Sequence, residues 1–172
     1  MRVDEAVRVA AVDDVDAVVE LELESRSRLP DVRGGVSWLS DNAALDASAI
    51  ADRLTTPDRD LVLVGELDHV VLGFATATIS LRPSGAVCEL TRLYVSPGAR
   101  ELGLGELMLE AATEWARSRG CAAIESNALP GDRETKNLFE RFGMKARLLV
   151  VHRSLDEQGA AGQGADGDGD EA

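Results

Sequence analysis

The chain lacks the features of a membrane protein. Within its 172 residues no apolar run approaches the roughly 20 residues that a membrane-spanning helix needs. No apolar signal region follows the first five residues. The sequence therefore predicts no membrane partner and a cytoplasmic location.

Cysteine and histidine are scarce, with two of each. Cys88 falls within an expected strand and Cys121 just after an expected helix, so both are interpreted as reduced core thiols, and neither has the spacing of a metal site. His69 and His152 lie far apart in the sequence and fit no ligand pattern. No metal cofactor is expected.

Positive charge is also in short supply. The formal net charge is −13, and such a field repels nucleic acid and anionic lipid, so no nucleic-acid partner is expected. Residues 157–172 hold five acids, no base and no large apolar residue that could form a core. We expect one domain over residues 1–155 and a disordered acidic tail, rich in Gly and Asp, over residues 156–172.

What the sequence does contain is an apolar strand followed by a turn with the pattern R-x-x-G-x-G. The strand ends at Val95, and Arg100, Gly103 and Gly105 then precede a helix. Glycine lets a ligand approach the backbone closely, and the free N–H groups of a first helical turn favour negative charge. Because an arginine can also bind phosphate oxygens through two donors, the turn is predicted to hold a phosphate or pyrophosphate.

Other interpretations of this turn fit less well. A P-loop needs Gly-Lys-Ser/Thr, which is absent, and a dinucleotide fingerprint needs a third glycine where Met108 stands. A flexible turn without a ligand is the remaining alternative. The arginine, the strand before the turn and the helical spacing of the apolar residues after it favour an anion site.

The stretch from Cys88 to Leu109 resembles motif A of the GNAT superfamily of N-acetyltransferases, whose R/Q-x-x-G-x-G/A loop holds the pyrophosphate of acetyl-coenzyme A (acetyl-CoA). The similarity is strongest over residues 81–155. It implies an α/β domain with a mixed, mostly antiparallel, twisted sheet, whose splayed central strands are flanked by helices. The residues that the resemblance implies for coenzyme binding are Leu93, Tyr94, Val95, Arg100, Glu101, Leu102, Gly103, Leu104, Gly105 and Asp132.

The hydrophobic pattern predicts the elements around this turn. Besides the central strand that ends at Val95, strands are expected at residues 7–10, 60–67, 70–81, 122–127 and 146–155. Helices are expected after an N-cap at Asp13, over residues 43–54, after the glycine turn, and from Asp132 to Gly143.

Residues 25–41, between the first two expected helices, show no regular pattern, since Pro30, Gly34 and Gly35 interrupt it. In the resembling family this region forms one wall of the acceptor site. The alternative is a solvated loop with Trp38 as its hydrophobic anchor.

The segment from Phe139 to Met144 resembles the Y-E-x-x-G-F end of the family's motif B. Phe139 takes the place of a tyrosine that would protonate the departing thiolate, and it has no hydroxyl. Asp132 stands where an asparagine usually contacts the coenzyme. Alternatively, Phe139 and its neighbours Leu138 and Phe142 form a core face at helical spacing.

A base is needed for the chemistry that the resemblance implies, because an alkylamine has a pKa of about 10.4 and is protonated at neutral pH. Glu89 lies where many members of the family carry a catalytic glutamate on the central strand. Alternation places Glu89 on one sheet face with Thr91, Leu93 and Val95. In an apolar cleft its pKa would rise, as a general base requires, and an edge or surface acid is the alternative.

The resemblance implies direct transfer of an acetyl group from acetyl-CoA to a primary amine on a small molecule or peptide, by a possible homodimer. Two alternatives stay open. One is a coenzyme A-binding regulatory or sensor domain without efficient catalysis, and the other is a nucleotide-binding interaction module. The sequence does not specify the acceptor amine, because the wall that would select it shows the least pattern.

Overall fold

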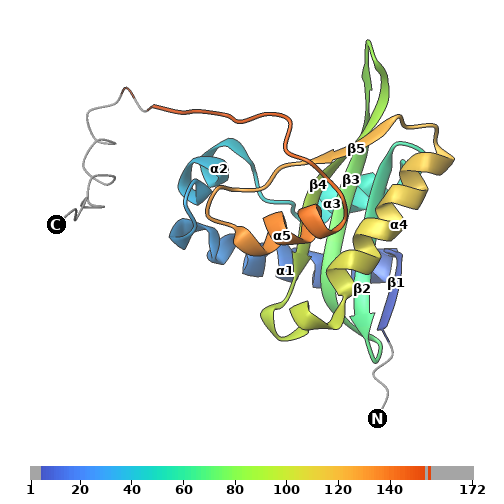
Figure 1. The fold of residues 1–172 in the computed structure, drawn as a ribbon. Helices are drawn as coiled ribbons and strands as arrows, with labels where there is room; N and C mark the ends of the chain where they lie inside the picture. Colours follow the sequence, from blue (N-terminus) through green and yellow to red (C-terminus); the bar gives the residue numbers. More distant parts are fainter. Residues whose placement is uncertain (1–4, 154, 156–172) are drawn as a thin grey trace.

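The computed structural model describes residues 5–153 and 155, so the expected tail over residues 156–172 lies outside the described part. The strands there are β1 (Glu5–Val9), β2 (Asp60–Leu67), β3 (Val70–Arg82), β4 (Gly85–Val95) and β5 (Ala123–Ser126). They form one sheet in chain order (Figure 1). The strands β1 to β4 pair antiparallel and β5 pairs parallel with β4, which confirms the mixed, mostly antiparallel sheet.

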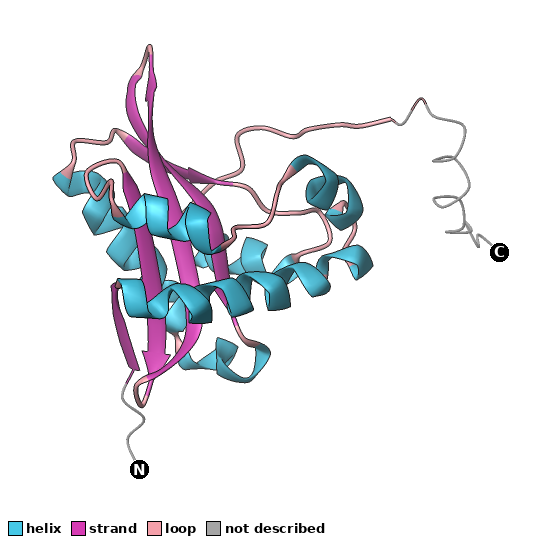
Figure 2. Ribbon diagram, turned by 180° about the vertical axis from the view of Figure 1, so that it is seen from behind, coloured by secondary structure: helices cyan, strands magenta, loops and turns pink. Residues whose placement is uncertain are grey.

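Helices cover both faces of the sheet (Figures 1 and 2). One face packs against α4 (Leu104–Ser118) and α5 (Arg133–Arg141), and the other against α1 (Val15–Ser27) and α3 (Ala47–Leu54). The shorter α2 (Gly35–Asp41) follows α1. No helix in the described residues is long and apolar enough to cross a membrane.

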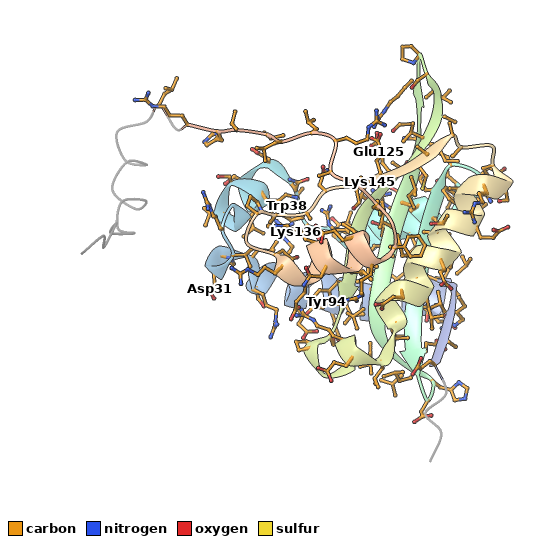
Figure 3. The ribbon with its side chains drawn as sticks, viewed as in Figure 1. Asp31, Trp38, Tyr94, Glu125, Lys136 and Lys145 are labelled. Atoms are coloured by element: carbon orange, nitrogen blue, oxygen red, sulfur yellow. The ribbon has the colours of Figure 1, made fainter. Side chains whose placement is uncertain are left out.

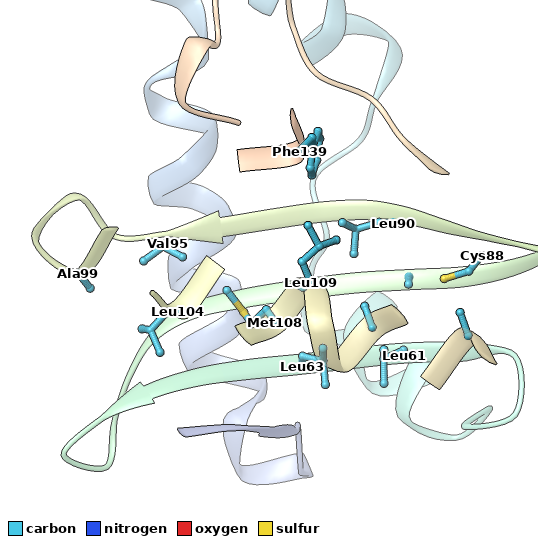
Figure 4. Packing of buried hydrophobic residues seen from close by; sticks show 14 of the residues in the cluster. Leu61, Leu63, Cys88, Leu90, Val95, Ala99, Leu104, Met108, Leu109 and Phe139 are labelled. Atoms are coloured by element: carbon cyan, nitrogen blue, oxygen red, sulfur yellow. The ribbon is translucent and has the colours of Figure 1, made fainter. Parts of the chain in front are cut away.

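Two clusters of buried side chains form the core, one on each face of the sheet. The first joins Leu63 of β2 and Leu90 of β4 to Met108 of α4 and Phe139 of α5 (Figure 4). The second joins α1 and α3 to the opposite face, where Phe74 of β3 is fully buried. The helices therefore fix β4 from both sides.

The two cysteines are free. Cys88 is fully buried in the first cluster, and this burial raises the pKa of its thiol to about 12. Cys121 is half-buried and packs against the same cluster. Both positions agree with the interpretation of the cysteines as core thiols.

A β-bulge at Thr91 interrupts the pairing of β4 with β3. The register shifts between Thr76 and Ala77, so that Thr76 lies opposite Arg92 while Ala77 lies opposite Leu90. Thr91 is the extra residue, and such a residue breaks the period-two alternation of side chains.

Because of this bulge, the side chain of Glu89 lies on a different sheet face from the one that strict alternation predicts. Leu90 and Val95 belong to one buried cluster, and Leu93 packs against it. Glu89 alternates with Leu90 and therefore points to the opposite face of the sheet. The prediction that Glu89 shares a face with Leu93 and Val95 is wrong, because the bulge inverts the alternation between them. Thr91 does share the face of Glu89, since its hydroxyl lies 2.8 Å from that of Thr76, which is opposite Val62 of the second cluster.

Residues 25–41 are largely helical rather than irregular. After α1 ends, a 3-10 helix, η2, spans Leu29–Asp31 and α2 follows directly. Pro30 lies in the first turn of η2, and Gly34, with φ of 87°, is the N-cap of α2. The residues interpreted as interruptions are therefore helix starts, a position that proline and glycine both tolerate.

The expected closing strand over residues 146–155 is wrong for the described residues 146–153 and 155. This segment pairs with no strand and runs away from the sheet after α5 (Figure 1). Leu148 and Val151 are each 85% exposed. Apolar residues favour a strand only where a neighbouring strand can pair with them, and local sequence does not reveal that partner.

An ion-pair cluster joins β1 and β2 to the start of α1. Both terminal nitrogens of Arg8 donate to the carboxylate of Asp14, at 2.7 and 2.8 Å, and Arg8 also pairs with Glu66. The backbone N–H of Ala11 donates to Asp14 at 2.7 Å. Asp14, rather than the expected Asp13, therefore supplies the carboxylate at this helix start, and the hydrogen bonds from Arg8 lower its pKa.

Candidate active site

The site is a cleft where β4 and β5 separate. Their parallel pairing ends at Leu90 and Ser126, whereas β4 continues to Val95. The edge of β4 over residues 91–95 therefore has no strand partner on the β5 side, and the backbone groups there that Arg92 and Arg100 do not bind are available to a ligand. The cavity at this edge has a volume of about 970 Å³.

One end of the cleft is the turn between β4 and α4. A 3-10 helix, η3 (Pro97–Leu102), leads to Gly103, which has a φ of 80° and is the N-cap of α4. The N–H of Leu107 is bonded to the carbonyl of Gly103 at 3.0 Å, so the three helical N–H groups before it have no partner within the helix. The turn therefore presents free donors and the positive end of the helix dipole to an anion.

Arg100 is placed to add a positive charge at this turn. Its Nε donates to the carbonyl oxygen of Val95 at 3.1 Å, and its guanidinium lies 5.8 Å from the ring centroid of Tyr94. These two contacts hold the side chain against β4. The remaining nitrogens face the cleft end, where Nη1 forms an ion pair with Glu134 of α5.

Glu134 and Arg100 differ in exposure. The Glu134 side chain is 70% exposed and the Arg100 side chain 31% exposed, so the two form a surface ion pair in which the glutamate is the more exposed partner. An anionic ligand at the turn must compete with this carboxylate for the guanidinium. The pair joins residues 34 positions apart, and no local pattern in the sequence predicts it.

Gly105 has a packing role besides any contact with a ligand. A Cβ at Gly105 would lie 3.1 Å from Cδ2 of Leu138, so its absence lets α5 approach α4 closely. The second glycine of the motif thus fixes the distance between the two helices at this end of the cleft.

Asp132 is the N-cap of α5, as predicted. Its carboxylate accepts hydrogen bonds from the backbone N–H of Thr135 at 3.0 Å and from the Thr135 hydroxyl at 2.6 Å. Both oxygens are therefore engaged within the helix start. Its expected contact with the coenzyme stays a prediction.

Phe139 packs in the core. It is 8% exposed and belongs to the buried cluster that contains Leu90 and Leu109, although it also lines the cleft. The core interpretation of this residue is confirmed. Since no hydroxyl is present, the side chain has no proton to give to a leaving group.

The other end of the cleft is lined by α1, α2 and β4. We call the cleft-lining residues of this part the acceptor wall, and they are Ser25, Arg28, Leu29, Val32, Trp38, Asn42, Thr91 and Arg92. Trp38 belongs to α2, and Tyr94 lies nearer the chain that leads into α4 (Figure 3). The segment that the sequence associated with the acceptor site thus does line the cleft.

A buried carboxylate, that of Glu22, forms ion pairs beneath the acceptor wall. Glu22 of α1 is fully buried and pairs with Arg92 at 3.3 Å and with Arg26 at 3.6 Å. Both guanidinium groups lie over the ring of Trp38, at 4.6 Å for Arg92 and 5.6 Å for Arg26. The sequence analysis did not predict a role for Glu22. Its position four residues after Val18 places it on the apolar face of the helix, and a charge on that face indicates a buried ion pair.

Two loops meet across the cleft between the acceptor wall and α5. A Cβ at Gly131 would lie 2.6 Å from the backbone nitrogen of Arg33, and a Cβ at Gly34 would lie 3.4 Å from Cδ of Pro130. The glycines therefore allow the chain after β5 to touch the chain before α2. This contact fixes the position of the acceptor wall relative to the end of β5.

Glu89 does not line the cleft. Its carboxylate accepts a hydrogen bond from Arg82 at 2.8 Å on the surface of the sheet, and Arg82 also pairs with Glu125. The hydrogen bond from Arg82 lowers the pKa of Glu89. The expected rise of this pKa is therefore wrong, because an ion pair surrounds the carboxylate instead of an apolar cleft.

The structure brings together most of the residues expected to bind the coenzyme. Those that line the cleft are Leu93, Tyr94, Val95, Arg100, Glu101, Gly103, Gly105 and Asp132. The side chains of Leu102 and Leu104 pack in the core instead. Among the described residues, no group of three or more His, Cys, Asp or Glu side chains is placed to hold a metal ion.

The family of the chain follows from its sequence as well as from this fold. Residues 19–144, well over half of the chain, match the model of the acetyltransferase (GNAT) family. The chain therefore belongs to the GNAT family.

Two relatives share part of the sequence. An aminoglycoside N(6')-acetyltransferase type 1 of Klebsiella aerogenes is 37% identical over 87 residues, which cover 47% of this chain and 55% of that protein. An uncharacterized N-acetyltransferase of Schizosaccharomyces pombe is 29% identical over 101 residues, which cover 58% of this chain and 60% of that protein. The chain thus matches only a little over half the length of these curated relatives.

Solved structures show the same fold at low identity. A tetramutant of the BH1408 protein of Bacillus halodurans has a TM-score of 0.74 and 19% identity, covering 87% of this chain and 99% of its own. The aminoglycoside N-acetyltransferase AAC(6')-Iy in complex with CoA has a TM-score of 0.65 and 18% identity, covering 91% of this chain and 98% of its own.

Proposed function

We propose that the chain is an N-acetyltransferase that binds acetyl-CoA with its pyrophosphate at the turn from Arg100 to Gly105. The observation that carries this proposal is the arrangement of that turn beside the unpaired edge of β4. The helix start supplies N–H donors, and Arg100 supplies a forked cation. The solved structure of a relative by fold in complex with CoA supports the choice of ligand.

The unpaired edge of β4 fits the rest of the substrate. A pantetheine arm carries amide groups, which can pair with the free backbone groups of residues 91–95 as a further strand would. This places the thioester near the point where β4 and β5 separate, beside the acceptor wall. A backbone N–H there can polarise the thioester carbonyl.

The reaction is a direct transfer. The neutral amine nitrogen of the acceptor attacks the thioester carbon, a C–N bond forms, and the C–S bond breaks. The amine loses one proton and the departing thiolate gains one, so that an amide and coenzyme A are released. Because a free thiol has a pKa of about 8.5, the thiolate can leave near neutral pH and take its proton from water.

No carboxylate or imidazole in the described residues of the acceptor wall is placed to take the amine proton. Glu89 was the expected base, and its ion pair with Arg82 and its place outside the cleft lining favour a structural role. We therefore propose that the acceptor loses its proton to solvent before attack. In that case turnover rises about tenfold per pH unit below the pKa of the amine.

Acetyl-CoA-dependent thiol release with a panel of small amines and peptides tests the function. The expected result is stoichiometric release of thiol and a gain of one acetyl group in the amine, detected by mass spectrometry. Binding of acetyl-CoA without transfer to any amine would contradict the proposal and indicate a coenzyme A-binding regulatory domain. The expected homodimer is tested separately by the mass of the protein in light scattering.

A further inference from the structure

The acceptor wall differs in charge from the rest of the chain. The chain has 31 acidic residues and 18 lysines and arginines. In the acceptor wall, however, the described residues include Arg28 and Arg92 and no aspartate, glutamate or histidine. This part of the cleft therefore offers basic but no acidic side chains to the molecule that enters it.

Two carboxylates of α1, those of Glu22 and Glu24, lie near this wall without lining it. Glu22 is buried beneath the wall and faces two guanidinium groups, those of Arg26 and Arg92, so one negative charge meets two positive charges. Glu24 accepts a hydrogen bond from the Ser96 hydroxyl at 2.8 Å and does not line the cleft.

The two arginines of the wall have different roles. Arg92 uses all its nitrogens within the protein, because it pairs with Glu22 and donates to the carbonyl oxygens of Thr91 and Ala43. The side chain of Arg28, by contrast, makes no hydrogen bond or ion pair with any described residue. Arg28 is exposed at the end of α1 and lines the cleft. It is the cation of this wall that is available to a ligand.

We propose that the acceptor is an amine that also carries an anionic group, a carboxylate or a phosphate, and that Arg28 binds this group. The proposal rests on the acetyl transfer proposed above and adds the class of substrate. A guanidinium recognises either anion through paired N–H donors. Polycationic amines such as aminoglycosides meet only positive charge at this wall and are poor acceptors.

The experiment compares acceptors that differ in one charged group. One set is 4-aminobutanoate, 1-aminobutane and 1,4-diaminobutane, and a second is glucosamine 6-phosphate and glucosamine. Kanamycin represents the aminoglycosides. The first set tests a carboxylate and the second a phosphate. We expect an anionic member to have a kcat/KM about ten- to a hundredfold above its neutral partner, the range for a charge-assisted hydrogen bond.

Arg28→Gln is the informative variant and Arg33→Gln is its control. Arg33 is close to Arg28 in the sequence and exposed, but it does not line the cleft. Arg33→Gln therefore removes one positive charge, as Arg28→Gln does, without changing the cleft. Arg28→Gln should raise KM for the anionic acceptor about tenfold or more, should change KM for the neutral partner much less, and should keep the acetyl-CoA affinity. Arg33→Gln should leave all three quantities unchanged.

Calorimetric binding of the same compounds to the CoA-loaded protein separates this inference from the proposed function. If anionic amines bind in an Arg28-dependent manner but are not acetylated, the function fails and the inference stands. Efficient acetylation of kanamycin or 1,4-diaminobutane in preference to the anionic compounds would overturn the inference alone. Failure of every anionic compound both to bind and to react would overturn it too, as would a loss of acetyl-CoA affinity in Arg28→Gln.

Discussion

Glu134 holds the guanidinium that an incoming pyrophosphate needs, so replacing it with glutamine should strengthen acetyl-CoA binding. The carboxylate pairs with Nη1 of Arg100 across the mouth of the turn. Because Nε of Arg100 is bound to the Val95 carbonyl, two phosphate oxygens can bind the guanidinium together only if Nη1 leaves Glu134. Glutamine removes the charge while keeping the size of the side chain.

The exposure of the two partners sets the size of the effect. With Glu134 at 70% and Arg100 at 31%, the pair is a surface ion pair, which is worth about 0.2–1 kcal/mol. Releasing Arg100 should therefore lower the Kd of acetyl-CoA by about 1.4- to fivefold. Salt screens such a pair, so the gain should shrink as ionic strength rises.

Calorimetric titration of acetyl-CoA measures the effect, and Glu101→Gln is the matched control. Glu101 also lines the cleft and is exposed, but its side chain pairs with no described cation, so its loss removes the same charge without releasing Arg100. We expect a larger gain from Glu134→Gln than from Glu101→Gln. In an Arg100→Gln background the Glu134 effect should fall to the size of the Glu101 effect.

Weaker binding in Glu134→Gln would refute this reasoning, because it would mean that Glu134 supports the ligand instead of competing with it. Equal gains in the two glutamine variants would show a general charge effect and no role for the ion pair.

Three further changes test other parts of the account. Glu89→Gln should alter turnover by less than about tenfold, since the carboxylate pairs with Arg82 outside the cleft; a loss of about 10²- to 10⁴-fold in steady-state kinetics would restore it as the base. Phe139→Tyr should also change turnover by less than about tenfold, because a thiolate can leave near neutral pH without an acid. A hundredfold gain would show that thiolate departure limits the enzyme. Asp14→Asn should lower the free energy of unfolding by about 1–3 kcal/mol at pH 7 through the lost bonds to Arg8. Because the folded state lowers the pKa of Asp14, this contribution is present above its usual pKa of 3.8 and is lost as the pH falls through the pKa of the folded state. Urea unfolding of the two proteins checks this. A difference in free energy of unfolding that grew toward pH 3 would contradict the assignment.

The sequence was sufficient where the pattern is local. The hairpin of β2 and β3 was expected at residues 60–67 and 70–81 and lies at Asp60–Leu67 and Val70–Arg82, because continuous and alternating apolar residues encode it directly. The glycine turn was located for the same reason. Gly103 needs its positive φ where a strand gives way to a helix, and such chemistry is visible in a few neighbouring residues.

What the sequence could not provide depends on partners distant in the chain. The bulge at Thr91 exists only against Thr76 of β3, and it moved Glu89 to the opposite face. The pairing of Arg100 with Glu134 depends on where α5 packs. The segment expected to form a strand over residues 146–155 has no neighbouring strand in the described residues. Its apolar residues therefore form no strand there.

The central claim is that the turn from Arg100 to Gly105 binds the pyrophosphate of acetyl-CoA, and calorimetric titration of wild type and Gly103→Val tests it most directly. Gly103 has a φ of 80°, which a β-branched residue resists, so valine requires the backbone of the turn to change its shape. A thermal melt must first show that the variant is folded. The account predicts that wild type binds acetyl-CoA and that the folded variant shows no measurable binding; equal affinity in the two proteins would place the coenzyme elsewhere.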